Sequence, residues 1–181
     1  MDTLIKLYKS YETERLLIRP TGIQDAPFIF QLMNSPKWLE FIGDRQIVSV
    51  DAAGSYIRKK MLPQLERLGF SNYTVIRKSD QAKLGSCGLY DREGLDGIDI
   101  GFAFLPEHVG QGYAHEAATR LMQAAREDFG LTRICGITDA NNLSSQRLLE
   151  KLGLRRKGSI QLSEESAPIW LYLWDAQDNS P

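Results

Sequence analysis

The amino-acid sequence predicts a single domain of mixed α/β structure built around a largely antiparallel sheet. The length of 181 residues is about that of one domain. Three runs with strand character follow one another between residues 70 and 104, separated by turn residues, which is typical of an antiparallel meander. From there to residue 174, helical and strand patterns alternate, so we expect helices to pack against the sheet. Residues 11–174 are the expected core of one domain covering residues 1–181.

Apolar periodicity predicts the individual elements in chain order, and Ser, Thr, Asp, Asn and Gly mark the helix ends. About seven strands are expected, at Arg15–Pro20, Phe70–Arg77, Lys83–Tyr90, Gly97–Phe104, Ile134–Thr138, Leu154–Leu162 and Ile169–Trp174. About four helices are expected, from Thr21 to Met33, from Ser49 or Asp51 to Gly69, from Gly112 to Gly130, and from Asn142 or Ser144 to Gly153.

The remaining segments are expected to be irregular. Residues 1–14 form a polar lead-in, residues 38–42 a loop, and residues 175–181 a loose tail. Pro63 falls inside the second helix and either kinks it or ends it early, because proline removes a helical hydrogen bond. Ile169–Trp174 is apolar enough to be an edge strand or a dimer surface, so a monomer and a homodimer both stay open.

Composition and charge exclude several classes of function. With 43% hydrophobic and 25% charged residues, the chain is typical of soluble globular proteins. A net charge of −1 gives no general attraction to nucleic acid or to a membrane, and no apolar run is long enough to span a bilayer. Cys87 and Cys135 are expected to be reduced core residues of a cytoplasmic protein. His108 and His115 belong to no metal-ligand pattern, so no metal is expected.

The turn Gly110-Gln111-Gly112 joins the last meander strand to the next helix. Two glycines let the backbone turn sharply and let a ligand approach without meeting a Cβ atom. The unpaired N–H groups and the dipole of the following helix then favour phosphate or pyrophosphate. The alternative is that the glycines only shape the turn. Gly112 is not followed by the Lys-Ser/Thr of a Walker loop, and His115 stands at the third glycine position of a dinucleotide fingerprint.

A second motif runs from Asp139 to Leu154, where a strand is followed by a polar loop and a helix. With this motif the chain resembles the GNAT superfamily of acyl-CoA N-acyltransferases. The family pattern Asn-x-x-Ser followed by Glu-Lys-x-Gly-Phe is similar to Asn142–Ser145 and Glu150–Leu154, with Leu154 in place of Phe. The Tyr that is the general acid of many relatives is not evident in the helix after Asn142.

Two other stretches extend the resemblance to about residues 11–174. Gly110–Ala117 is similar to the pyrophosphate turn Gly-x-Gly-Tyr-Ala-x-Glu-Ala of the family. Thr13–Arg19 is similar to the first strand of the branch that contains the ribosomal-protein N-terminal alanine acetyltransferases. The motifs are specific for the superfamily and much less specific for the substrate.

The resemblance implies a fold whose sheet is splayed at an acetyl-CoA site, between the end of the strand at residues 97–105 and the strand near Ile134. It implies transfer of an acetyl group from acetyl-CoA to a primary amine by direct attack within a ternary complex. A backbone N–H near Phe104 or Leu105 polarises the thioester oxygen in this scheme. The expected cofactor-binding residues are Phe104, Leu105, Val109, Gly110, Gln111, Gly112, Tyr113, Ala114, Asn142 and Ser145.

Two expected catalytic residues follow from the same resemblance. Asp99 is the expected general base, acting directly or through water, and Glu116 is the second choice. Ser145 is expected to help protonate the leaving thiolate. Simpler roles are also open: Asp99 as a sheet-surface or turn residue, Ser145 as a helix-start residue, and Asn142 as a turn former.

The acceptor is the least determined part of the expected function. A protein N-terminal amine is the first choice from the branch resemblance. A small-molecule amine, such as an antibiotic, a polyamine or an amino-acid derivative, and a non-catalytic acyl-CoA-binding module are the alternatives. Trp38, Phe41 and Tyr56 either belong to the core or line an acceptor pocket.

Overall fold

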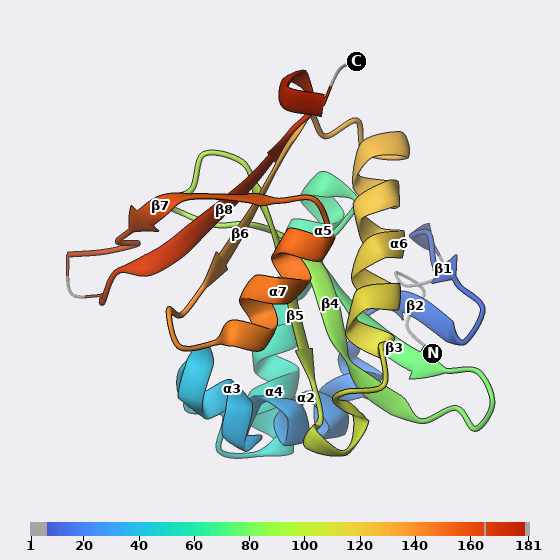
Figure 1. Cartoon of the computed structure of the whole chain (residues 1–181). Coiled ribbons are helices and arrows are strands. Elements are labelled where there is room, and N and C mark those ends of the chain that lie inside the picture. The colour runs from blue at the N-terminus through green and yellow to red at the C-terminus, as the bar shows by residue number, and fades with distance from the viewer. Residues whose placement is uncertain (1–6, 165, 180–181) are drawn as a thin grey trace.

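The computed structural model describes residues 7–164 and 166–179 of the chain (Figure 1). Residues 1–6 of the expected lead-in and residues 180–181 of the expected tail lie outside the described residues. Eight strands form one sheet in the order β1-β2-β3-β4-β5-β6-β8-β7. Every neighbouring pair is antiparallel except β5 and β6, which are parallel. The expected mixed, largely antiparallel sheet is therefore confirmed.

The elements follow the predicted order, with boundaries close to those expected. The strands are β1 (Tyr11–Glu12), β2 (Leu16–Pro20), β3 (Asn72–Arg77), β4 (Lys83–Asp91), β5 (Ile98–Phe104), β6 (Arg133–Thr138), β7 (Arg155–Ile160) and β8 (Ile169–Asp175). The α-helices are α2 (Ala26–Met33), α3 (Pro36–Phe41), α4 (Val50–Tyr56), α5 (Leu62–Leu68), α6 (Tyr113–Glu127) and α7 (Leu143–Lys151). Shorter turns are η1 (Ile23–Asp25), η2 (Ile57–Met61), η3 (Pro106–His108) and η4 (Gln177–Asn179).

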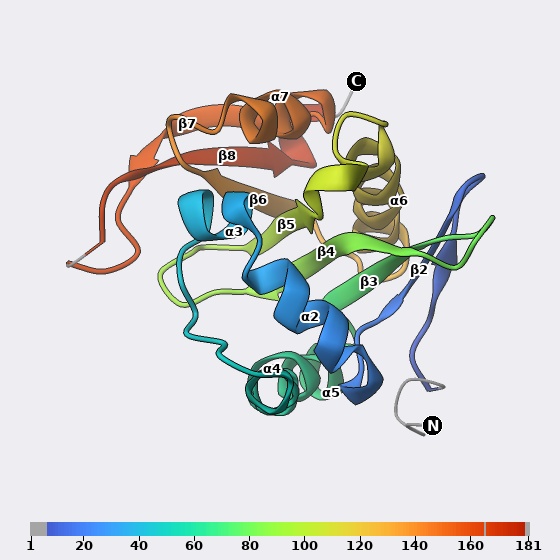
Figure 2. The ribbon, with the colours of Figure 1, turned by 90° about the horizontal axis from the view of Figure 1, so that it is seen from below.

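Helices cover both faces of the sheet, with α6 and α7 on one face and α2, α4 and α5 on the other (Figure 2). The face under α6 holds one buried apolar cluster, and the face under α2, α4 and α5 holds a second. Four fully buried alanines let α6 approach the strands closely: Ala117, Ala118, Ala124 and Ala125. Ala114, predicted on the same apolar stripe, is only half-buried. In the described part of the chain, no helix has both the length and the apolar character to cross a membrane.

The first 25 residues depart from the prediction in two places. Tyr11 and Glu12, expected in the lead-in, pair with Ile18 and Leu17 as the edge strand β1. Thr21, expected to cap a helix, is instead buried and hydrogen-bonds through its hydroxyl to that of Thr74 at 2.9 Å. The Thr21–Thr74 contact joins segments 53 residues apart, so local helix signals do not reveal it.

The segment expected as a loop at residues 38–42 contains the helix α3. Ser35 is extended and Pro36 occupies the first helical turn, where a proline is pre-organised for helix. Pro63 neither ends the second helix nor breaks it, because the chain passes from α4 to α5 through the π-helical turn η2. A wider turn just before a proline accommodates the missing N–H and the bulk of its ring. Ser49 caps this helix as predicted, accepting a hydrogen bond from the Ala52 N–H.

At its C-terminal end the sheet also differs from the expectation. β8 lies between β6 and β7, so the Ile169–Trp174 strand is internal and the suggestion of an edge strand there was wrong. The edge is β7, where Arg155, Arg156 and Lys157 are all exposed and the register shifts before Gly158. The expected loose tail begins later than Asp175, which ends β8, and η4 follows it.

The sheet is splayed between its two central strands. β5 and β6 pair only at Ile98 with Ile134 and at Asp99 with Cys135. β5 continues for five more residues along β4, and β6 continues to Thr138 along β8. The predicted splay near Ile134 is therefore present, and it leaves two strand edges without a neighbouring strand.

Candidate functional site

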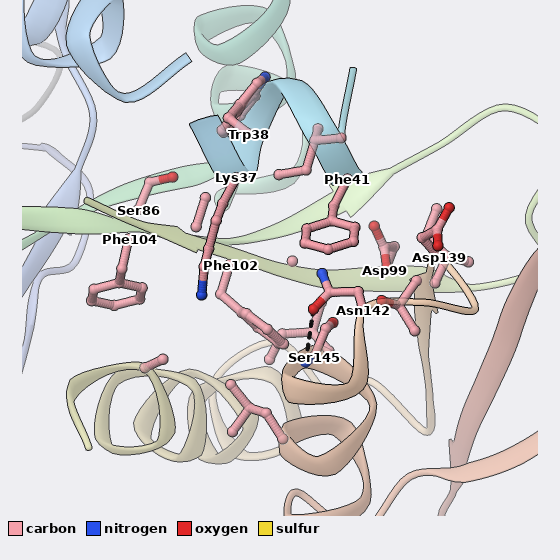
Figure 3. Close-up of a pocket in the computed structure, with 18 of the residues that line it drawn as sticks. Lys37, Trp38, Phe41, Ser86, Asp99, Phe102, Phe104, Asp139, Asn142 and Ser145 are labelled. Atoms are coloured by element: carbon pink, nitrogen blue, oxygen red, sulfur yellow. Dashed lines mark hydrogen bonds between the residues drawn. The ribbon is translucent and has the colours of Figure 1, made fainter. Parts of the chain in front are cut away.

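A cavity of about 800 Å³ opens where β5 and β6 diverge (Figure 3). Its walls come from β5 and β6, from the first turns of α6 and α7, and from residues 36–61, which we call the acceptor-side wall. Most of the predicted site residues line it: Asp99, Phe104, Val109, Gly110, Gly112, Tyr113, Ala114, Asn142 and Ser145. Leu105, Gln111 and Glu116 do not.

The backbone of β5 presents hydrogen-bonding groups to this cavity. The Leu105 N–H donates to the Leu84 carbonyl at 2.9 Å. This bond determines which residues of β5 direct their backbone groups towards β4 and which direct them away. Because successive residues of a strand point their N–H and C=O groups to opposite sides, Phe102 and Phe104 direct theirs away from β4 and into the splay. The expectation for Leu105 is thus corrected: its N–H is engaged within the sheet, and the donor on this edge comes from Phe104 or Phe102.

The glycine turn has the geometry of an anion site. Gly110 and Gly112 have φ angles of +81° and +82°, a backbone region that favours glycine. The Glu116 N–H donates to the carbonyl of Gly112, the residue before α6, at 3.0 Å. No hydrogen bond found outside the regular helices and strands of residues 7–164 and 166–179 uses the N–H groups of residues 110–114. Of these residues, Gly110, Gly112, Tyr113 and Ala114 line the cavity at a helix N-terminus, an arrangement that suits a pyrophosphate.

Gln111 points away from that cradle. Its side-chain amide donates to the Glu107 carbonyl at 3.0 Å, and its own carbonyl accepts from the Arg15 guanidinium at 3.1 Å. Arg15 also lies over the Tyr113 ring, with its guanidinium carbon 4.4 Å from the ring centroid. Arg15 therefore stabilises the turn from the side away from the cavity. Because the Gln111 side chain and carbonyl are already hydrogen-bonded, only its N–H is left to contact a ligand.

The second motif forms the start of α7. Asn142 is the N-cap: its side-chain oxygen accepts from the Ser145 N–H at 3.2 Å and from the Ser144 hydroxyl at 3.1 Å (Figure 3). The structural role that the sequence left open for Asn142 is thus present. The Ser145 side chain is half-buried on the cavity wall, and its hydroxyl has no hydrogen-bond partner among the described residues. A free hydroxyl there can donate to a ligand atom.

Asp99 is a buried carboxylate at the base of the splay. Its side chain is about 2% exposed, and one oxygen, Oδ2, accepts from Arg92 Nε. The other oxygen, Oδ1, is buried without a hydrogen-bond partner in the described chain. Burial raises the pKa of Asp99 to about 6, and the Arg92 charge and hydrogen bond, together with the nearby Ile137 backbone N–H, limit that rise. A carboxylate with such a pKa is largely ionised at neutral pH and is able to accept a proton.

Glu116, the second choice for a base, lies outside the cavity. Its carboxylate accepts from the Thr13 hydroxyl at 2.6 Å, the Arg15 N–H at 3.0 Å and Arg15 Nε at 2.7 Å. Although partial burial acts to raise its pKa, these hydrogen bonds and the Arg15 charge lower it below the usual value. Glu116 therefore ties the turn after β1 to α6 and does not face the reacting groups.

Several cavity residues were missed or left undecided by the sequence. Trp38, Phe41 and Tyr56 line the cavity, which favours the pocket over the core alternative. Arg92 and Lys37 lie between the predicted helices and strands, and no local pattern marks them. Asp139, just after β6, also lines the cavity, and its Oδ1 accepts a hydrogen bond from the Asn141 N–H at 2.7 Å. These residues come from separate elements, so only the fold brings them together.

Comparison with known proteins gives one family. The family model of the "Acetyltransferase (GNAT) domain" matches residues 15–155. A curated relative in Bacillus subtilis (strain 168), the uncharacterized N-acetyltransferase YnaD, is 25% identical over 163 residues, covering 90% of this chain and 91% of the relative.

Two solved structures share the fold. A GNAT-family acetyltransferase from Bacillus anthracis superposes with a TM-score of 0.76 at 24% identity, covering 93% of this chain and 99% of that protein. RimL, a ribosomal L7/L12 alpha-N-protein acetyltransferase in complex with coenzyme A, has a TM-score of 0.79 at 16% identity. That alignment covers 92% of this chain and 98% of RimL.

Proposed function

The chain belongs to the GNAT family of acetyltransferases, and we propose that it acetylates the α-amine at the N-terminus of a protein. As a family member, it is an acetyl-CoA-dependent acyltransferase. One observation carries the proposed chemistry: a single cavity joins a pyrophosphate cradle, an open strand edge and a buried carboxylate with a raised pKa. RimL, which shares the fold, is named for α-N-acetylation of a ribosomal protein.

The described residues suit acetyl-CoA. The unpaired N–H groups of residues 110–114 are placed to hold its pyrophosphate, and Gly110 has no atom within 4 Å of the position where a Cβ would stand. The free edge of β5 at Phe102 and Phe104 is placed to bind the extended pantetheine arm, as a strand edge binds another strand. Acetyl-CoA supplies the activated acetyl group as a thioester. An N–H on the same edge would polarise the thioester oxygen.

Asp99 and Ser145 would handle the protons of the reaction. As the amine nitrogen bonds to the acetyl carbon and the carbon–sulfur bond breaks, Asp99 takes the amine proton, directly or through water. The Ser145 hydroxyl donates a hydrogen bond to the sulfur that leaves as thiolate. A base with a pKa of about 6 suits an α-amine, with a pKa near ~8, better than a lysine amine near ~10.4. This match supports an N-terminal acceptor over a polyamine.

Two alternative functions are a small-molecule acetyltransferase and a non-catalytic acyl-CoA-binding module. A small amino-acid derivative also carries an α-amine, so it competes with the N-terminal acceptor on the same chemistry. A non-catalytic acyl-CoA-binding module would need the glycine cradle but no buried carboxylate beside it, and Asp99 favours the enzyme. The free, buried thiols of Cys87 and Cys135 suit a reducing compartment, and on that ground we propose the cytoplasm.

Thermal unfolding with added acetyl-CoA, followed by an acetylation assay, tests the proposal. A ligand that binds only the folded state at 100 times its Kd stabilises it by about 2.7 kcal/mol, which is easily measured. We expect that stabilisation with acetyl-CoA and CoA but not with NAD or NADP, and N-terminal acetylation of peptides by mass spectrometry. Blocking the peptide α-amine should abolish product. Absence of a shift at millimolar CoA would contradict the cofactor assignment, and acetylation of small amines alone would contradict the acceptor.

A further inference from the structure

The acceptor-side wall contributes only positive charge to the cavity. Lys37, Arg45 and Lys60 line it, together with apolar and aromatic side chains. The acidic residues of the same segment, Glu40, Asp44 and Asp51, are exposed elsewhere and do not line it. An enzyme whose acceptor is an amine, and therefore partly an ammonium ion, is expected to avoid such a wall unless the acceptor also carries negative charge.

These cations are not neutralised within the described residues. None of the three takes part in a salt bridge or a side-chain hydrogen bond in the described part of the chain. Two acids line the cavity, Asp99, which pairs with Arg92, and Asp139, which keeps its charge, and the lining cations outnumber them. The cavity thus keeps an unbalanced positive field, and low-dielectric walls strengthen such a field.

Lys37 is the best placed of the three. It lies on α3, and Figure 3 shows its ammonium group reaching into the cavity, towards Phe102 and Phe104 on β5. The glycine cradle and the start of α7 lie on the opposite side of β5 from α3 (Figure 3). The phosphates of acetyl-CoA would have separate partners there, because the N–H groups of residues 110–114 are unpaired and Arg147 and Lys151 of α7 also line the cavity.

We propose that the acceptor is an acidic peptide N-terminus, whose first residues carry carboxylates that Lys37, Arg45 and Lys60 bind. This inference rests on the proposed function and narrows its substrate class. The α-amine would lie towards Asp99, and the side chains that follow it would extend along α3. Polyamines and lysine-rich N-termini would be rejected, because their charges would face the same cations without a counter-charge.

Three matched peptides test the proposal, identical except at their second and third residues. One begins Ser-Glu-Asp, one Ser-Gln-Asn and one Ser-Lys-Arg, so that shape is nearly constant between the first two while charge changes. We expect kcat/KM to be at least about tenfold higher for the acidic than for the neutral peptide, the size expected of one charge-assisted hydrogen bond. The difference should shrink as salt rises from 0.05 to about 0.5 M. Equal rates, or faster acetylation of the basic peptide, would overturn the inference.

Variants then locate the effect. Lys37→Gln and Lys60→Gln should lower kcat/KM for the acidic peptide by a larger factor than for the neutral peptide, and the KM for acetyl-CoA should change less than either. Lys37→Glu should reverse the preference towards the basic peptide. Lys59→Gln is the matched control, because Lys59 is exposed beside Lys60 but does not line the cavity. An effect of Lys37→Gln on the KM for acetyl-CoA alone would assign Lys37 to the cofactor and contradict its role in acceptor binding.

The inference and the proposed function fail in different ways. If no peptide of any charge is acetylated, the N-terminal acceptor is wrong. The charge preference is then decided with free amines, using glutamate against spermidine as the probes. Faster acetylation of spermidine would remove the charge inference as well, whereas faster acetylation of glutamate would keep the anionic acceptor and transfer it to small molecules.

Discussion

Arg92 binds one oxygen of Asp99 and leaves the other free. The Arg92 guanidinium donates to Oδ2, whereas Oδ1 is buried without a partner among the described residues. The same guanidinium lies 4.9 Å from the centroid of the Tyr90 ring, which fixes its position. Asp99 is therefore held in one orientation, and we propose that its Oδ1 takes the amine proton, directly or through water.

Replacing Arg92 tests this relationship. Burial is the main cause of the raised pKa of Asp99 and Arg92 opposes it, so Arg92→Gln should raise that pKa further above 6. In the proposed mechanism the carboxylate must be ionised, so kcat should increase with pH through an apparent pKa near 6 in the native enzyme and at higher pH in the variant. Arg92→Lys should restore part of the difference. Identical pH–kcat profiles for native and Arg92→Gln enzyme would show that Arg92 does not position the base.

Removing the proposed base or acid should impair turnover but not cofactor binding. Asp99→Asn should lower kcat by about 10²–10⁴-fold and abolish the acidic limb of the pH profile, since a positioned base typically contributes that much. Ser145→Ala should lower kcat while the thermal shift with CoA stays within error, because the cradle at residues 110–114 is untouched. Full activity of Asp99→Asn would require another base, and the cavity-lining Asp139 would be the next residue to replace.

Comparing alanine substitutions at Gly110 and Gly130 should distinguish the effect of backbone strain from an effect on ligand binding. Gly110 and Gly130 both have positive φ, +81° and +62°, and neither has any atom within 4 Å of the position that a Cβ would occupy. Alanine at either position should cost about 1–2 kcal/mol in unfolding free energy from the left-handed backbone. Only Gly110→Ala should also weaken CoA binding, measured by calorimetry, because its Cβ would stand where the ligand approaches. Gly130 closes the far end of α6 and is the matched control. Equal CoA affinity in the two variants would place the pyrophosphate elsewhere.

Glu116 is expected to support the site mechanically. Glu116→Gln removes the charge that holds Arg15, and it should lower the unfolding free energy by about 1–3 kcal/mol, the usual cost of disrupting charged hydrogen bonds. CoA affinity should fall modestly, since Arg15 braces Gln111 and Tyr113. The shape of the pH–kcat profile should not change. Loss of its acidic limb in this variant would instead assign Glu116 the role of base.

Asp25 links stability to pH. It is fully buried and bound by Arg19 at 2.7 Å and Lys83 at 2.7 Å, and although burial opposes it, these contacts lower its pKa. A lowered pKa adds stability that is complete above the unfolded value near ~3.9 and is lost as the pH falls through the folded value. Asp25→Asn should cost about 3–5 kcal/mol in urea unfolding at pH 7. The deficit should narrow below pH 4, and a pH-independent deficit would contradict the linkage.

Sequence patterns predicted the elements with a sustained apolar repeat and the turns marked by characteristic turn residues. The α6 stripe, the meander of β3 to β5 and the glycine turn were all legible, because each follows from the spacing of a few residues in one segment. β1 has only two residues, which is too short for an apolar period, and its pairing with β2 defines it. α3 has six residues and depends on Pro36.

The candidate site was predictable to the same extent. Gly110, Gly112, Asn142 and Ser145 belong to contiguous motifs, and all line the cavity as expected. The partner of Asp99, by contrast, comes from the turn after β4, and Lys37 from a helix that was not predicted. Only the fold brings these separate elements together at the cavity, so the structure was needed to identify these residues as part of the site.

The position of the open strand edges bears on which strands another chain could pair with. The outer edges are unattractive to another strand, because β1 is only two residues long and β7 carries three exposed cations beside a register shift. The hydrogen-bonding groups that would most readily recruit a foreign strand lie instead on β5 and β6, inside the splay. An extended ligand such as a pantetheine arm would pair with them inside the cavity, which residues of α3 and α7 also line. The sheet can thus keep a vacant edge for chemistry without the aggregation risk that an exposed edge brings.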